Sequence, residues 1–227
     1  MAACGKAIRT RSRYAASTQR VCFKPAGHGG KCEEFPYLRH FVIAAPKVAD
    51  KIIRDSIMTT GAAWKSEKAG PNRILRWVML RSDEELADLG INMANLKPQV
   101  VAKLREKAAD YSSCMAVAQK LTSLAYGMAN SPEAPLEIQH ELEELGVPVV
   151  LGRTSCLVCG EALDFNLFAA AKRGKAEIET SHSNPRLHIP ANVGFAHRAC
   201  NIAQGNKTVE EFYDWITEIL ARVRPGQ

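Results

Sequence analysis

The chain has 227 residues, of which 46% are apolar, and it carries 30 Lys and Arg against 24 Asp and Glu, a net charge of +6. This length allows one large domain or two small ones with a real hydrophobic core. No apolar run is long enough to cross a membrane, so an integral membrane protein is excluded, while the modest basic excess suits a polyanionic partner without establishing one.

The first region, residues 1–45, is rich in glycine, basic residues, cysteine and histidine, and it lacks a periodic apolar pattern. Its opening stretch MAACGKAIRTRSRYAASTQR has no apolar segment of the kind that a secretory signal contains. We therefore expect a cytoplasmic protein. The chain has seven cysteines. In the cytoplasm, those that cluster in the sequence are expected to bind metal rather than to form disulfides.

The second region, residues 46–148, is predicted to be mainly helical, because apolar residues recur at a helical spacing in three stretches. The three stretches are residues 45–61, 96–130 and 131–146. Ser131 is the expected N-cap of the last helix, and Gly146 is expected to end it. A short apolar run at residues 72–80 is compatible with either a helix or a strand.

The third region, residues 149–227, differs in character from the second. It contains two short strand candidates, AEIETSH at residues 176–182 and NVGFAH at residues 192–197. A final amphipathic helix is predicted over residues 208–223. The sequence therefore predicts a small mixed α/β module after a mainly helical part.

Four metal-ligand residues in the third region form two closely spaced pairs. Cys156 and Cys159 make a CxxC, and His197 and Cys200 make an HxxC. A CxxC turn lets two thiolates approach one ion at tetrahedral angles, and Cys3His is a common shell for structural zinc. The alternative is four unrelated buried residues, but two paired spacings in one short segment favour zinc.

The residues around these pairs, about 150–210, resemble the HNH nucleases, whose catalytic module is the ββα-metal fold. His182 ends a strand-like run, Asn192 follows in the loop, and Asn201 comes nine residues later, where a helix begins. Flanking knuckles that bind a structural zinc are also common in that family. The resemblance implies an α+β fold, with a mainly helical N-terminal and central part and a C-terminal zinc-stapled ββα-metal module.

The resemblance also implies roles for individual residues. His182 would be the general base that activates water, since imidazole has a pKa near neutral. A hard divalent cation, Mg²⁺ or Mn²⁺, would be bound by Asn201, while Asn192 would hold the loop. Many HNH sequences have Asp just before the catalytic histidine, whereas this chain has Ser181. Glu179 lies on the same strand face as Ser181 and could supply the missing carboxylate.

Three further residues of the module have side chains that could contact DNA or a metal. Arg186 in the loop and Lys207 after the helix are candidates for contact with a DNA phosphate, although each could equally be a surface charge. His188 stands between two apolar residues, so a packed, hydrogen-bonded histidine is expected there rather than a metal ligand.

The N-terminal region holds a second possible zinc site. Cys4, Cys22 and Cys32 would need one histidine to complete a tetrahedral shell. His40 is slightly preferred, because His28 lies in a tight glycine-rich turn. The alternative is ordinary thiols in an irregular arm, and the basic surroundings of the arm suit contact with a DNA backbone.

Together these features predict a metal-dependent endonuclease acting on double-stranded DNA, of the type II restriction class, in a bacterial or phage-infected cell. We expect residues 1–45 to form a Cys/His-rich arm, residues 46–148 a helical region for DNA positioning or dimerisation, and residues 149–227 the nuclease domain. A restriction enzyme that cuts a palindrome would be a homodimer. The alternatives are a homing or mobile-element nuclease, a nickase, and a zinc-containing DNA-binding protein without catalysis.

Overall fold

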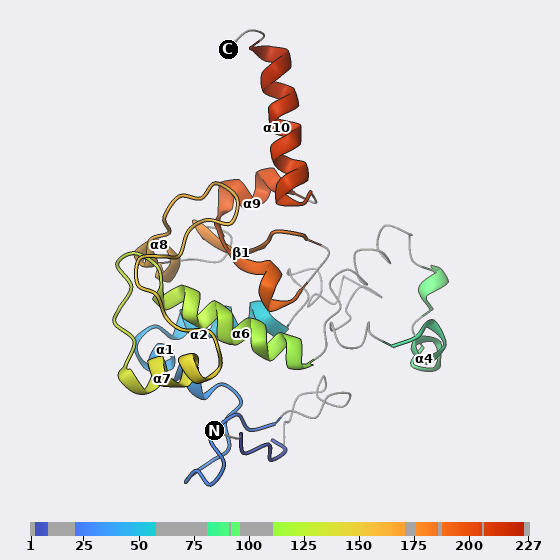
Figure 1. Ribbon diagram of the computed structural model, residues 1–227. Coiled ribbons are helices and arrows are strands. Elements are labelled where there is room, and N and C mark those ends of the chain that lie inside the picture. The colour runs from blue at the N-terminus through green and yellow to red at the C-terminus, as the bar shows by residue number, and fades with distance from the viewer. Residues whose placement is uncertain are drawn as a thin grey trace.

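The computed structural model shows, in the residues that it describes, a mainly helical protein with a two-stranded hairpin beside its C-terminal helices (Figure 1). The described residues are 3–8, 21–57, 81–90, 92–95, 111–170, 176–185, 188–205 and 207–224. The elements are η2 (Pro36–Leu38), α1 (Arg39–Ala44), α2 (Pro46–Ile57), α4 (Asp83–Asp88), η5 (Met93–Asn95), α6 (Tyr111–Tyr126), α7 (Leu136–Glu144), α8 (Phe165–Ala169), β1 (Ile178–His182), η6 (Pro190–Asn192), β2 (Val193–His197), α9 (Arg198–Gln204) and α10 (Val209–Val223).

Helices α2 and α6 form the centre of the hydrophobic core. α2 is strongly amphipathic, and its residues Val48 and Ile52, one turn apart, are buried. They face α6, which packs along α2 and buries Leu121 and Ala125. The same cluster of buried residues continues through the hairpin to Phe212 in α10, so the helical part and the hairpin share one core.

The hairpin is antiparallel, and its register pairs Ile178 with His197 and His182 with Val193. β2 is buried over four of its five residues, because it packs against α6 and α9. Phe195 of β2 meets the ring of Phe168 in α8 edge-on, with 4.8 Å between the ring centroids. The hairpin is therefore held from several sides and is a rigid support for the residues at its ends.

Successive residues of β1 contact different helices, since side chains alternate across a strand. Glu179 accepts a hydrogen bond from Asn201 of α9 at 3.0 Å. Thr180, the next residue, donates one to Asp55 of α2 at 2.9 Å. β1 thus lies between α9 and α2, and each helix can influence one face of the strand.

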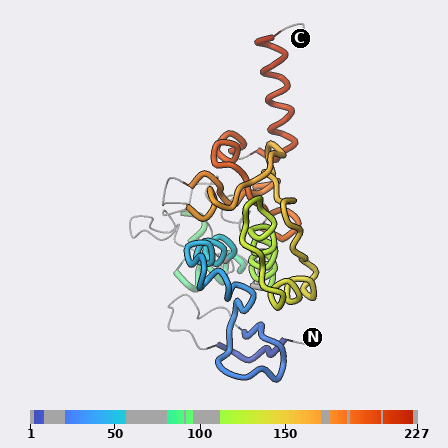
Figure 2. The backbone as a smooth tube through the Cα atoms, turned by 90° about the vertical axis from the view of Figure 1, so that its left-hand side faces the viewer, coloured from blue at the N-terminus to red at the C-terminus, as the bar shows by residue number. Residues whose placement is uncertain are grey.

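The C-terminal helix α10 projects away from the rest of the protein, and the described start of the N-terminal arm lies at the opposite end (Figures 1 and 2). A capping box starts α10: the Thr208 hydroxyl accepts from the Glu211 amide, and the Glu211 carboxylate accepts from the Thr208 amide. The helix predicted over residues 208–223 is confirmed almost to the residue.

Both predicted strands and the helices within the described residues are confirmed, with one correction. The helix predicted over residues 131–146 begins at Leu136, and Ser131 is not its cap. The Ser131 hydroxyl donates instead to the Tyr126 carbonyl at the end of α6. Pro135 disfavours helical backbone at the preceding residue, so the helix cannot begin before Pro135, which is its N-cap. Gly146, with φ of +74°, ends the helix as expected.

Some predicted segments lie outside the described residues, namely the run at residues 72–80 and the first part of the helical stretch, residues 96–110. Among the helices that are described, none has the length and apolar character required to cross a membrane.

Leu157 of the CxxC turn packs closely against Gly194 in β2, and substitution of this glycine tests that packing. A Cβ at Gly194 would lie 2.9 Å from Cγ and Cδ1 of Leu157, so Gly194→Ala must displace the Leu157 side chain, the turn that carries it or the strand. We expect a loss of about 1–3 kcal/mol in the free energy of unfolding, measured by chemical denaturation. Gly29→Ala is the control, because a Cβ there meets no atom within 4 Å. Equal stability of the two variants would contradict the packing described.

Candidate metal centres and active site

Cys156, Cys159, His197 and Cys200 lie together, with one ligand atom from each residue within 4.8 Å of the others. The two cysteines of the CxxC occupy a turn that Gly160 closes with φ of +77°. His197 is the last residue of β2, and Cys200 lies in the first turn of α9. The cluster therefore joins the turn before α8 to the junction between strand and helix.

The electrostatics of this cluster fit a bound divalent cation. Burial tends to raise the pKa of the Cys156 thiol, but hydrogen bonds from the amides of Cys159, Val158 and His197 outweigh it and lower the pKa to about 7. Burial and the neighbouring thiols raise the pKa of Cys200 to about 12. All three sulfurs can be thiolates together only if a cation offsets their repulsion, and zinc is the ion that a Cys3His shell suits.

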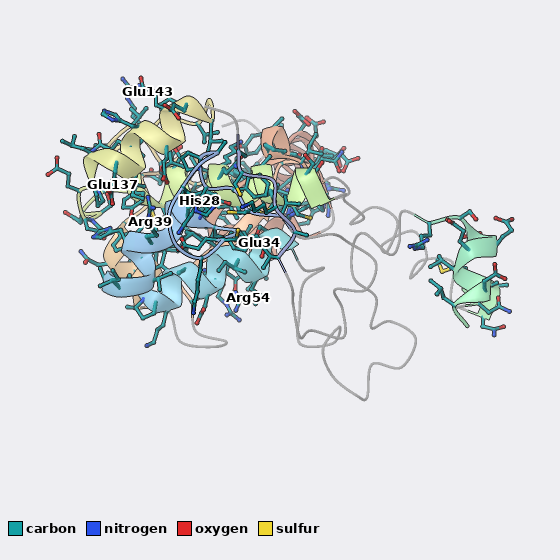
Figure 3. The ribbon with its side chains drawn as sticks, turned by 90° about the horizontal axis from the view of Figure 1, so that it is seen from below. His28, Glu34, Arg39, Arg54, Glu137 and Glu143 are labelled. Carbon is teal, nitrogen blue, oxygen red and sulfur yellow. The ribbon has the colours of Figure 1, made fainter. Side chains whose placement is uncertain are left out.

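A second cluster of the same composition lies in the N-terminal arm and consists of Cys4, Cys22, His28 and Cys32. The Cys22 sulfur lies 3.4 Å from Nε2 of His28. Burial would raise the pKa of Cys22, yet hydrogen bonds from the backbone, chiefly from the Lys24 amide, lower it to about 7. Figure 3 labels His28 among the side chains of the N-terminal segment. Both clusters are compatible with zinc.

The preference for His40 as the fourth ligand of this cluster is wrong, since the structure places His28 there. His40 belongs to α1, and its Nδ1 atom lies 2.9 Å from the hydroxyl of Tyr126, against whose ring it stacks. The sequence favours His40 because His28 lies in a glycine-rich turn, but that turn brings His28 back to the cysteines. Gly27 and Gly30 both have positive φ, so they reverse the chain on either side of His28.

Asn192 organises the loop between the two strands. Its side chain is 7% exposed, and its Oδ1 atom accepts from the Ser183 hydroxyl at 2.6 Å and from the Asn184 amide at 2.7 Å. Its Nδ2 atom donates to the Asn184 carbonyl at 2.7 Å. The buried side chain of Asn192 thus accepts two hydrogen bonds and donates one, and together they fix the start of the loop immediately after His182.

Glu179 and Asn201 face each other between β1 and α9. Besides the bond from Asn201, the Glu179 carboxylate lies 3.5 Å from the guanidinium of Arg198. Carboxylate and amide oxygens are the donors that a hard cation such as Mg²⁺ prefers. A carboxylate from β1 and a side-chain amide from α9 thus lie together and are partly exposed, with Nδ2 of Asn201 facing the carboxylate and Asn201 next in sequence to Cys200.

Ser181 does not join this pair. It is 1% exposed, and its hydroxyl donates to the side chain of Gln204 at 3.4 Å. Gln204 also donates to the carbonyl oxygens of His182 and Lys207, so this buried amide connects β1 with the end of α9. Gln204 was not singled out in the sequence, where nothing in AQGNK distinguishes it from a surface residue.

His182 ends β1 and lies beside His188. Nε2 of His182 is 2.9 Å from Nδ1 of His188, which is 2% exposed. His188 is therefore packed and hydrogen-bonded, as the sequence predicts. Of the two phosphate-contact candidates, Lys207 places its ammonium 4.7 Å from the ring centroid of Trp215, while Arg186 lies outside the described residues.

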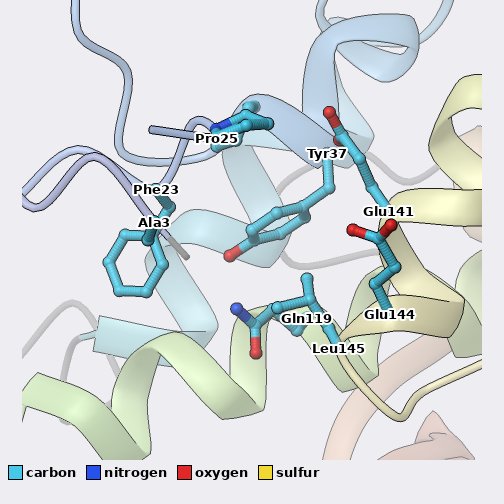
Figure 4. Close-up of a pocket in the computed structure, with 9 residues that line it drawn as sticks. Ala3, Phe23, Pro25, Tyr37, Gln119, Glu141, Glu144 and Leu145 are labelled. Atoms are coloured by element: carbon cyan, nitrogen blue, oxygen red, sulfur yellow. The ribbon is translucent and has the colours of Figure 1, made fainter. Parts of the chain in front are cut away.

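A small pocket of about 90 Å³ lies elsewhere, between the N-terminal arm and helices α6 and α7 (Figure 4). Its lining residues are Ala3, Phe23, Pro25, Pro36, Tyr37, Gln119, Glu141, Glu144 and Leu145. None of these belongs to either Cys/His cluster or to the hairpin. The Glu141 carboxylate is held by Arg39 at 2.7 Å, so the pocket is a gap beside an ion pair rather than a reactive site.

The profile of the DraIII family matches residues 34–200, which include the CxxC turn, the hairpin and the start of α9. The chain belongs to the DraIII family. It is also similar to a solved structure described as a type II restriction endonuclease, with 40% identity over 99% of both chains and a TM-score of 0.79. Comparison with curated proteins finds no match.

The choice of His28 over His40 can be tested by metal content. We expect the wild-type protein to carry two zinc ions per chain, His28→Ala to carry one, and His40→Ala to keep both, because only His28 lies with the three cysteines. Zinc per chain would be measured by atomic emission after gel filtration. Loss of an ion from His40→Ala but not from His28→Ala would contradict this assignment.

Proposed function

We propose that this protein hydrolyses double-stranded DNA at an HNH-type ββα-metal site formed by β1, β2 and α9. Membership of the DraIII family and the full-length match to a solved type II restriction endonuclease make the chain a type II restriction endonuclease. The observation that supports the finer proposal is the hairpin followed directly by α9: His182 ends β1, Asn192 lies in the loop beside it, and Asn201 of α9 contacts Glu179, three residues before His182.

His182 is the proposed general base. It lies at the end of β1, half-buried, and the loop after it is fixed by Asn192. An imidazole at this position can take a proton from the attacking water at neutral pH, because its ordinary pKa is near neutral. Asn192 acts indirectly, because its hydrogen bonds keep the loop, and hence His182, in one place.

Glu179 and Asn201 are the proposed ligands of the catalytic cation. Glu179 supplies the carboxylate that Ser181 cannot, and it faces α9 as Ser181 does. Arg198 holds the carboxylate in position from the first turn of α9. When bound, Mg²⁺ or Mn²⁺ would supply a Lewis acid for the charge that develops on the scissile phosphate.

Zinc bound at the two Cys3His clusters would have a structural role. The cluster at residues 156–200 would fix the junction of β2 and α9, and the cluster at residues 4–32 would fix the fold of the arm. We propose that residues 1–45 and 46–148 position the DNA or mediate dimerisation, and that residues 149–227 cut it. A homodimer would present two such sites to the two strands of a palindrome.

The base can be tested by substitution of His182, with His140 as the control. His140 is an exposed histidine of α7, far along the chain from the hairpin. We expect His182→Ala to cleave phage or plasmid DNA about 10²- to 10⁴-fold more slowly than wild type, the range that a general base contributes. His140→Ala should cleave at the wild-type rate.

Cleavage should also require added Mg²⁺ or Mn²⁺ in protein that retains its zinc, and Glu179→Gln should need a higher concentration of that cation. Gel shifts without the cation would show that each variant still binds DNA. Cleavage by His182→Ala at the wild-type rate would rule out this site.

A further inference from the structure

Beside the proposed base lies a second histidine that the reaction scheme above does not use. Nδ1 of His188 is 2.9 Å from Nε2 of His182, and Nε2 of His188 is 2.9 Å from the carbonyl oxygen of Ser56. The three groups form a chain that runs from the end of β1 to the end of α2. His188 is 2% exposed and Ser56 is fully buried, so water does not compete for these contacts.

The direction of each hydrogen bond follows from the acceptor at the end of the chain. A carbonyl oxygen can only accept, so Nε2 of His188 must carry a hydrogen and donate it to Ser56. In a neutral imidazole the other nitrogen then has a lone pair, so Nδ1 of His188 accepts. Nε2 of His182 must therefore be the donor, and the lone pair of a neutral His182 lies on Nδ1.

The carbonyl of Ser56 suits this role because of its place in the fold. Ser56 lies in the last turn of α2 (Pro46–Ile57), and its carbonyl oxygen is 2.9 Å from Nε2 of His188. The carbonyls of this turn carry the negative end of the helix dipole. A proton gained by His182 adds positive charge to the histidine pair, and the end of α2 lies where it stabilises that charge.

On this basis we infer that His188 is a positioning residue that fixes the tautomer of His182, so that Nδ1 of His182 is the atom that takes the proton from water. The inference rests on the proposed function of His182 as the base. In the step, the water proton passes to Nδ1, the water oxygen bonds to phosphorus, and the bond from phosphorus to the 3′ oxygen breaks. The leaving oxygen takes a proton from solvent.

Two substitutions separate the two bonds of His188. In His188→Gln the side-chain amide can still donate to Ser56, but no acceptor remains for His182. In His188→Asn the amide oxygen lies where Nδ1 was and can accept from His182, while the bond to Ser56 is lost. We expect His188→Gln to lower the single-turnover rate by about 10- to 100-fold, a part of what a base contributes, and His188→Asn to stay within about tenfold of wild type.

Stability should follow the opposite order, because the bond to Ser56 joins the loop of His188 to α2. His188→Asn should unfold at a lower temperature than His188→Gln, and both should bind DNA with wild-type affinity. A purely structural role would make the less stable variant the slower one. That result, or a wild-type rate for His188→Gln, would overturn the inference.

A second readout does not depend on activity. In protein labelled with ¹⁵N-histidine, NMR reports which ring nitrogen carries the hydrogen, and the signals missing from His182→Ala identify His182. We expect the Nε2–H tautomer in wild type and a mixture in His188→Gln. A wild-type Nδ1–H tautomer would overturn the inference. Full activity of His182→Ala would instead remove the proposed function, whatever the tautomer.

Discussion

The junction between β2 and α9 is the constraint on which the candidate site depends. His197 ends the strand and Cys200 lies one turn into the helix, and both share a cluster with the CxxC turn at Cys156 and Cys159. The four-residue cluster sets the direction in which α9 leaves the hairpin. Asn201 follows Cys200 directly, so the cluster that could hold zinc also restricts the position of Asn201, the proposed ligand of the catalytic cation.

Because β1 lies between two helices, its two faces contact different sets of side chains. The face with Glu179 and Ser181 meets α9, where oxygen donors gather. The face with Thr180 meets α2, and through His188 the ring of His182 is also connected to α2. The alternation of a β-strand thus puts Glu179, a proposed cation ligand, and His182, the proposed proton acceptor, on different faces although they are only three residues apart. It also makes the helical part of the chain a contributor to the site.

The sequence was sufficient to predict the hairpin, the CxxC and HxxC pairs and the loop asparagine, because each depends on short-range spacing. The start of α10 likewise depends on local sequence, because the capping box of Thr208 and Glu211 spans only four consecutive residues. The resemblance to HNH nucleases added the roles of these residues, which spacing alone does not supply.

Long-range contacts were not predictable from the sequence. Ser56 lies 132 residues from His188, and nothing near either residue indicates their hydrogen bond. The choice between His28 and His40 depended on where α1 turns toward Tyr126, which is a matter of tertiary packing. Ser131 had the chemistry of a cap, but a proline four residues later moved the start of the helix.

The central claim is that Glu179 and Asn201 hold the divalent cation of a site in which His182 is the base. The most direct test is diffraction from crystals of the protein with Mn²⁺ and a DNA duplex that carries its mapped cleavage site, with data collected above and below the manganese absorption edge. We expect a manganese peak within coordination distance of the Glu179 carboxylate and of Oδ1 of Asn201, in contact with a DNA phosphate. A manganese peak on the phosphate but away from both residues would contradict it.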